Sequence, residues 1–391
     1  MLPSSNSYKS AVLAPSRQTN SRVTITMNAL NNGNPQVFDD NRVISANIIE
    51  EISILNLTSP ANQLLLTLDN TDNLFSFLTL NNIHTIIASR PSIKVEFGIV
   101  LEDAAIEWIP MGTFYVDSWK NDTGSMTITF TAHDYLMILG NTSFDSTAIT
   151  TANALAVAIF QNAGITNYWI DPSVESHLGY NRMTWSTNSR DLLQHLAILT
   201  GTTLYQDRYG VVKLEKFPSI LESQMYTLHV SSQNGLYHYV SPNTYEEQST
   251  EGGMRSILMD NMFEIPSVTL DQSIYQVNIN VYSTDPLDDN FTTYTYTNPN
   301  LGGGRGGMAF TLDIPMVTST ASAKVIAARM FAETMYNAVY VARWRQNPIM
   351  VATDIVIIDD SNNTMKQTRV TKQEFQYKGY LSGTTESRGG V

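Results

Sequence analysis

Alternating hydrophobic and polar residues mark much of the first 140 residues. In Ile93–Val100 and Met126–His133 every second side chain is apolar, and most of the residues between them are polar or small. A period of two places one face of a strand on a core and the other toward solvent or a neighbour. Turn-rich clusters separate these runs, at Asn31–Pro35, Asp69–Asn73 and Asn121–Gly124. The pattern predicts a barrel or sandwich of short strands.

The period changes near residue 148. Apolar residues follow helical spacing over Ala152–Ile159, and Gly164 is well placed to end this helix. A second helix is predicted to begin at Ser189, a capping residue, and to end at Gly201. Two strands joined by a turn at Asp207–Gly210 come next, at Thr203–Gln206 and Val211–Phe217. This stretch predicts a small α/β insert between β-rich regions.

Strand patterns return in the last third of the chain. Tyr275–Val281 alternates, Thr284–Gly307 is irregular, and Ala321–Tyr340 has the spacing of a third helix. Three further strands are predicted, at Asp354–Ile358, Thr368–Lys372 and about Glu374–Leu381. The last ten residues, SGTTESRGGV, are polar and glycine-rich, so a frayed tail is expected there.

Composition indicates a folded protein without cysteine chemistry. The chain has 391 residues, of which 42% are hydrophobic and 15% charged, which disfavours disorder. It contains no cysteine, which excludes disulfides, thiolate nucleophiles and Cys-based metal sites. It has no apolar run long enough for a transmembrane helix, and its N-terminus lacks the apolar core of a secretory signal.

Negative charge disfavours broad binding to nucleic acid. The net charge is −13, and residues 316–391 carry nine basic and six acidic residues, so the negative excess lies in the first 315 residues. An acidic surface repels phosphates, although DNA can still pass through a channel lined by such a surface.

Motifs for catalysis or metal binding are missing from the sequence. The six histidines show neither an HExxH motif nor an H-x3–5-H spacing: His84, His133, His177, His195, His229 and His238. Gly302–Gly307 (GGGRGG) lacks the lysine of a phosphate-binding loop, so a mobile loop is the simpler interpretation. We therefore predict no catalytic, cofactor-binding or metal-binding residues, no cofactor and no enzymatic activity.

Acidic residues leave two alternatives open. Two groups could supply oxygen ligands to calcium without matching an EF-hand loop: Asp285, Asp288, Asp289 and Asn290, and Asp69, Asp72 and Asn73. A glycosidase needs two carboxylates across a cleft, and Glu246 or Glu247 with a distant aspartate would meet that need. Solvated acidic turns are the simpler interpretation of all these residues.

Three segments, in order, resemble the bacteriophage tail hub family, which includes baseplate hubs and the N-terminal hub region of tail-associated lysins. Met111–Asp117 (MGTFYVD) and Ser125–Leu139 (SMTITFTAHDYLMIL) are similar to the end of the family's first barrel. Thr187–Phe217 is similar to its helix and hairpin, and Thr320–Leu381, with RWRQNP at Arg343–Pro348, to the closing half of its second barrel. Thr353 departs from the family's pattern, which has glycine there.

The resemblance implies a mostly β fold with an α+β insert, in which two β-barrels per chain form a pseudo-sixfold ring in a trimer. It places the first hub barrel at residues 1–140 and the α/β insert at 141–262. The second barrel is expected at 263–283 and 315–391, with 284–314 inserted and packed on the α/β region.

The implied function is structural. The resemblance implies a homotrimeric adaptor in the virion tail tip, made in the host cytoplasm, with a channel for DNA. Its implied partners are a hexameric tail-tube or distal tail ring on one side, and a central spike, fibre, plug or tape-measure protein on the other. It implies no specific nucleic-acid binding. Two alternatives remain: a host-glycan-binding adhesin and a peptidoglycan hydrolase of the tail tip.

Overall fold

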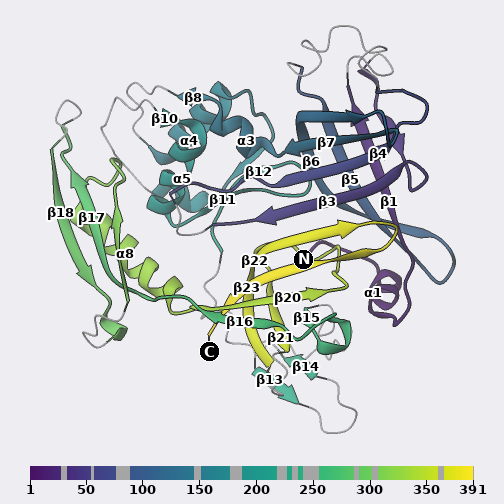
Figure 1. Cartoon of the computed structure of the whole chain (residues 1–391). Helices are drawn as coiled ribbons and strands as arrows, with labels where there is room; N and C mark the ends of the chain where they lie inside the picture. Colours follow the sequence, from purple (N-terminus) through teal and green to yellow (C-terminus); the bar gives the residue numbers. More distant parts are fainter. Residues whose placement is uncertain are drawn as a thin grey trace.

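The computed structural model is mostly β, with one large, largely antiparallel sheet and a few helices beside it (Figure 1). The mostly β character expected from the sequence is thereby confirmed. The structure describes residues 1–27, 33–53, 57–75, 89–144, 151–176, 187–217, 227–230, 237–240, 255–285, 290–301, 307–359 and 365–390.

The first seven strands form one end of the large sheet, which we call the first half-sheet. They are β1 (Thr19–Thr26), β2 (Gln36–Phe38), β3 (Val43–Glu51), β4 (Gln63–Asp69), β5 (Ser92–Val100), β6 (Ile106–Asp122) and β7 (Thr127–His133). The alternating runs predicted at 93–100 and 126–133 are confirmed as β5 and β7, whose apolar residues are buried. Helix α1 (Asn6–Leu13) packs beside this half-sheet through buried Tyr8 and Val12.

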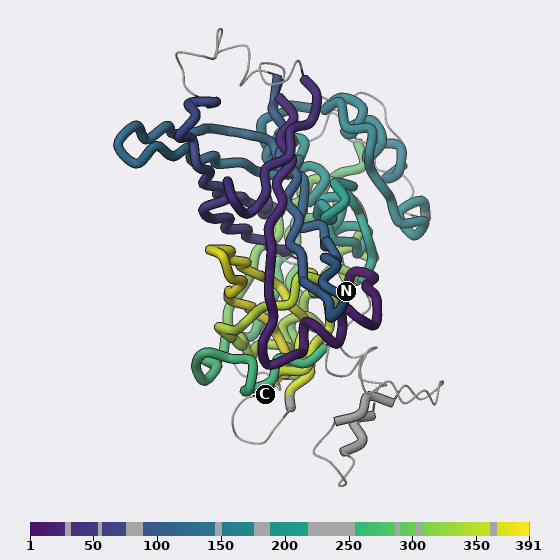
Figure 2. The backbone as a smooth tube through the Cα atoms, turned by 90° about the vertical axis from the view of Figure 1, so that its right-hand side faces the viewer, coloured from purple at the N-terminus to yellow at the C-terminus, as the bar shows by residue number. Residues whose placement is uncertain are grey.

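The second half-sheet comes from the C-terminal part of the chain. Its strands are β15 (Ser256–Ile257), β16 (Ser267–Leu270), β20 (Ala338–Trp344), β21 (Ile355–Asp359), β22 (Met365–Tyr377) and β23 (Leu381–Gly389). Together with the first half-sheet these strands make a 13-stranded sheet. Figure 2 shows the N-terminal strands, in purple and blue, above the C-terminal strands, in yellow.

Strand β22 joins the two half-sheets. Its residues 372–377 pair antiparallel with residues 46–51 of β3, and its earlier residues pair with β21. Phe375 and Tyr377 are buried in the core of the first half-sheet, where the Tyr377 ring stacks on Phe97 of β5 at 5.6 Å. The two ends of the sequence therefore share one hydrophobic core.

A helical region follows β7, largely as the sequence predicted. Its elements are α3 (Tyr135–Gly140), β8 (Ser143–Phe144), α4 (Ala152–Asn162), β9 (Tyr168–Ile170), β10 (Thr187–Asn188), α5 (Ser189–Thr200), β11 (Thr203–Gln206) and β12 (Val212–Glu215). The cap of α5 is Asn188 rather than Ser189, because the Asn188 side chain accepts a hydrogen bond from the Asp191 backbone. Gly201 ends α5 with a φ of 79°, as expected.

A small separate sheet packs against the helical region. It contains β17 (Ile274–Tyr282), β18 (Phe291–Thr297) and β19 (Met308–Leu312), and α8 (Thr320–Thr334) lies beside it. Strand β17 and helix α8 share a hydrophobic core with α4 and α5, in which Val277, Ile279 and Ile326 are buried. The second barrel that the resemblance implies, at 263–283 and 315–391, stays a prediction.

Two sequence predictions near the C-terminus were wrong. The third helix ends at Thr334, not Tyr340, because Ala338–Trp344 pairs as β20 with β23. The expected frayed tail is strand β23, which is hydrogen-bonded on both sides, to β20 and β22. Its alternating small and polar residues face the second half-sheet's interior, where Ser387 and Thr385 are buried.

Candidate functional site

A buried ion pair holds the helical region to both half-sheets. Arg208, in the turn between β11 and β12, donates to Glu50 of β3 at 2.8 Å. Arg208 also donates to the backbone carbonyls of Pro348 and Met350, in the loop after β20. Its guanidinium lies 5.0 Å from the centre of the Phe375 ring. The Arg208 side chain thus links the helical region, to which it belongs, to both half-sheets.

Gln373 of β22 completes this cluster, which we call the joint: Glu50, Arg208, Gln373 and the two carbonyls. The Gln373 amide donates to Met350 O at 3.0 Å and to Glu50 at 3.4 Å. All three side chains belong to residues at most 9% exposed. Buried charges require such compensation, since an unpaired one is costly. The joint therefore fixes the arrangement of the helical region and the two half-sheets relative to one another.

Asp134 lies where β7 passes into α3. It caps the helix by accepting from the Leu136 amide at 2.9 Å, and it accepts from the Asn62 amide at 3.0 Å. Complete burial raises the pKa of this carboxyl to about 7, against the opposing effects of the two amides and of Arg190. The sequence identified Asp134 as part of a motif, but its burial depends on elements far along the chain.

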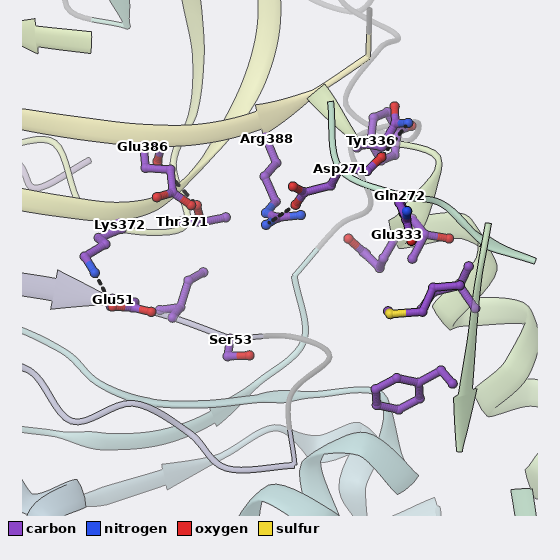
Figure 3. Close-up of a pocket in the computed structure, with 16 residues that line it drawn as sticks. Glu51, Ser53, Asp271, Gln272, Glu333, Tyr336, Thr371, Lys372, Glu386 and Arg388 are labelled. Carbon is purple, nitrogen blue, oxygen red and sulfur yellow. Dashed lines mark hydrogen bonds and ion pairs between the residues drawn. The ribbon is translucent and has the colours of Figure 1, made fainter. Parts of the chain in front are cut away.

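A crevice of about 280 Å³ lies between the second half-sheet and the three-stranded sheet. Figure 3 shows two ion pairs in it, Lys372 with Glu51 and Arg388 with Asp271, at 2.9 and 2.7 Å. Glu333, near the end of α8, and Glu386 of β23 also line the crevice. The sequence did not single out these residues, because they come from five separate segments.

The end of the second half-sheet presents apolar side chains to solvent. Strand β16 pairs with β20 alone among the described strands, so its other edge is open. All four residues of β16 are exposed. Four large apolar side chains in this segment are 46–66% exposed: Phe263, Ile265, Val268 and Leu270. An apolar open edge is a ready template for pairing with another chain.

The histidines considered as metal ligands are dispersed over separate elements. His133 lies on β7 and His195 on α5, while His229 and His238 oppose each other in the hairpin of β13 (Thr227–Val230) and β14 (Tyr237–Val240). Burial lowers the pKa of His195. His84 and His177 lie outside the described residues. Within the described ranges, no three His, Asp or Glu side chains are grouped as around a metal ion.

In the first of the two acidic groups considered for calcium, the carboxylates of Asp69 and Asp72 already bind other groups of the chain. Asp69 accepts from the Thr71 amide, and Asp72 pairs with Arg42 at 2.9 Å. Asp285 and Asn290 are among the described residues, whereas Asp288 and Asp289 lie outside them.

The remaining candidates fall mainly outside the described part of the chain. Glu246, Glu247 and residues 302–306 of the glycine-rich segment lie there. Gly307 is described: a Cβ on it would lie 2.1 Å from the Ser273 carbonyl, so this glycine is needed for close packing of β19 on β17.

Neither a family model nor a curated protein matches the sequence. In the described part of the chain, no helix combines the length and apolar character needed to cross a bilayer.

Solved structures of tail proteins share this fold over nearly the whole chain. A tail protein from Neisseria meningitidis superposes with a TM-score of 0.54 and 11% identity, over 94% of this chain and 96% of that one. A 43 kDa prophage tail protein from Shewanella oneidensis gives 0.56 and 12%, over 94% and 98%. A prophage tail protein from Listeria monocytogenes gives 0.50 and 10%, over 94% of each chain. The chain is thus similar in fold to phage tail proteins, the likeness that its sequence motifs indicated.

Proposed function

We propose that the chain is a structural subunit of a phage tail tip or baseplate hub. The observation that carries the proposal is a fold likeness to tail proteins over 94% of this chain and at least 94% of theirs. Because the likeness covers nearly the whole of both chains and not one shared domain, it favours a similar role in the tail assembly. In this proposal the protein is a virion component of the tail tip, made in the host cytoplasm.

The ring arrangement belongs to the same proposal. Three chains form a homotrimer, and the two half-sheets of each chain are the two barrels of a pseudo-sixfold ring. Such a ring matches a hexameric tail tube or distal tail ring on one side and a central spike, fibre or tape-measure protein on the other. The open, apolar edge of β16 supports contact with another chain. Heterologous contacts of this kind close into rings when the rotation permits.

The negative net charge of the chain is compatible with a channel through which DNA passes. The chain carries a net charge of −13, so a bore lined by its acidic part repels phosphates and lets DNA pass without adsorption. We propose a mechanical role without catalysis, in keeping with the tail-protein fold.

The test is the symmetry and activity of the purified chain. Mass measurement over a range of concentrations, and particle images with the cognate tail-tube protein, are expected to show a threefold ring seated on the sixfold tube. A strictly monomeric subunit within tails, or a stable hexamer, would contradict the trimer. Clearing of host peptidoglycan by the purified chain, lost on changing one acidic residue, would instead establish the hydrolase alternative.

A further inference from the structure

Two arginine side chains lie together where the C-terminal end of α1 meets the loop after β20. Arg17 donates to the Val12 carbonyl at 3.4 Å and also to the Arg345 carbonyl. Arg345 donates to the Ala14 carbonyl at 2.9 Å and to the side-chain oxygen of Asn261 at 3.4 Å. Oxygen atoms of the chain thus hold both guanidinium groups in place before any ligand binds.

The positive charge of these two side chains has no acidic partner. Among the described residues, no salt bridge includes either guanidinium. Asp260, the neighbour of Asn261, is exposed and pairs with neither arginine. The carbonyl groups at the end of α1 offset only part of the charge, since a helix terminus carries about half an elementary charge. About one and a half positive charges therefore stay uncompensated.

Both arginines line a small hollow between α1 and the loop after β20, with a volume of about 10 Å³. One water molecule needs about that much space, so a single oxygen atom of a ligand fits there. The Nε atoms of Arg17 and Arg345 donate to no group in the described part of the chain. Neither Nε is closed off from solvent, so each arginine keeps an unused donor that a ligand can reach.

The two guanidinium groups also repel each other. Burial and the charge of Arg345 together lower the pKa of Arg17 to about 10. Arg17 remains charged at neutral pH, but its charged form is less stable than it is in water. A negatively charged ligand beside both side chains would offset this repulsion.

A phosphate monoester matches these properties. It carries a charge of about −1.5 to −2 at neutral pH and three acceptor oxygens. Guanidinium groups bind phosphate oxygens through two parallel N–H bonds. A single carboxylate, with one charge and two oxygens, would leave part of the positive charge unpaired. A DNA phosphodiester belongs to a long polyanion, which a chain with a net charge of −13 repels.

We propose that Arg17 and Arg345 bind the phosphate monoester group of a ligand. One phosphate oxygen occupies the hollow, and the others accept from the unused N–H groups of the two arginines. This inference goes beyond the proposed function, because it requires neither a ring nor a DNA channel.

The test uses the full chain labelled with ¹⁵N, in which the Nε–H signals of arginine are followed by nuclear magnetic resonance. Inorganic phosphate is titrated at neutral pH, and sodium chloride is titrated separately to the same ionic strength. Two Nε–H signals are expected to shift and saturate with phosphate, at a concentration about tenfold below that for chloride, the effect of one charge-assisted hydrogen bond. Shifts that do not saturate, or an equal response to chloride, overturn the proposal.

Variants locate the site. Arg345→Gln keeps a donor for the Ala14 carbonyl without the charge, and Arg17→Lys keeps the charge without the two parallel N–H bonds. Each is expected to weaken phosphate several-fold, whereas Lys94→Gln, an exposed position on β5, leaves it unchanged. If one arginine variant fails to fold, the other decides. Unchanged binding of phosphate in a folded arginine variant overturns the proposal.

Two further probes identify the ligand group. Phenyl phosphate and benzoate carry a phosphate or a carboxylate on the same ring, and phenyl phosphate is expected to bind more tightly. Benzoate that binds equally well overturns the assignment to phosphate. A short DNA duplex without terminal phosphates offers diesters alone and is expected not to displace phosphate, so displacement overturns the assignment to a monoester. These titrations do not depend on oligomeric state, so a monomeric chain that binds phosphate contradicts the ring alone.

Discussion

Arg208 and Glu50, 158 residues apart in sequence, form an ion pair of 2.8 Å inside the protein. Their side chains are 3% and 11% exposed, so solvent screens this pair little. Because Arg208 also bonds to the Pro348 and Met350 carbonyls, the pair connects the helical region to both half-sheets.

Glu50→Gln is expected to lower the free energy of unfolding by about 3 kcal/mol, since it leaves a buried guanidinium without its counter-charge. Urea unfolding of the purified chain measures this change. A double variant, Glu50→Gln with Arg208→Met, is expected to lose less stability than the sum of the two single variants. Strict additivity would show that the two side chains do not stabilise each other.

Asp134 gives a prediction about pH. Its pKa is about 7 in the folded protein, against about 3.9 in an unfolded chain. Between these values the unfolded state loses a proton that the folded state keeps, so the free energy of unfolding falls as pH rises from about 4 to about 7. The loss amounts to roughly 4 kcal/mol for a shift of this size.

The measurement compares the wild type with Asp134→Asn between pH 4 and pH 8. The variant is expected to show a flatter dependence, together with a pH-independent cost, because an amide nitrogen cannot accept from the Asn62 backbone. Parallel curves for the two proteins would mean that Asp134 does not keep its proton in the folded state.

A substitution at Gly383 tests the pairing of β23, the strand found where a frayed tail was expected, with β22. A Cβ at this position would lie 1.8 Å from the Glu374 carbonyl on β22. Gly383→Ala is therefore expected to lower stability by about 1–3 kcal/mol, the usual cost of overpacking. Gly390→Ala is the matched control, because nothing lies within 4 Å of its added carbon. Equal melting temperatures for the two variants would contradict the pairing of β22 with β23.

The edge of β16 gives a prediction about assembly. Replacing Val268 and Leu270 with lysine is expected to prevent association of subunits while leaving the urea midpoint within the error of measurement, since both side chains are exposed. Val325→Lys, on the exposed face of α8, is the control for added charge. Normal assembly of the double variant would exclude this edge as a contact between subunits.

Local elements were predictable from the sequence because their causes are local. The alternation in β5 and β7, the apolar face of α4 and the positive φ at Gly201 depend on neighbouring residues only. The third helix was extended too far because Ala338 continues the helical spacing, whereas pairing of β20 with β23 prevails. Strand pairing with a distant segment here outweighs the local preference for helix.

The joint and the crevice were not predictable for a related reason. Glu50, Arg208 and Gln373 have no spacing that relates them, and they meet only after three segments have packed. Likewise the tail of β23 has polar residues typical of a loop, and its burial comes from strands on both sides. Single-sequence patterns do not report contacts at such distances along the chain.

The pairing of β3 with β22 also affects how the protein is made. Residues 46–51 of β3 emerge early from the ribosome, but their partners at 372–377 follow about 320 residues later, on the order of tens of seconds at roughly 5–20 residues per second. Until then the first half-sheet lacks Phe375 and Tyr377 in its core and has an open edge at β3. Nascent chains that stop before residue 372 are thus expected to need chaperones or to aggregate, because an unpaired edge invites association.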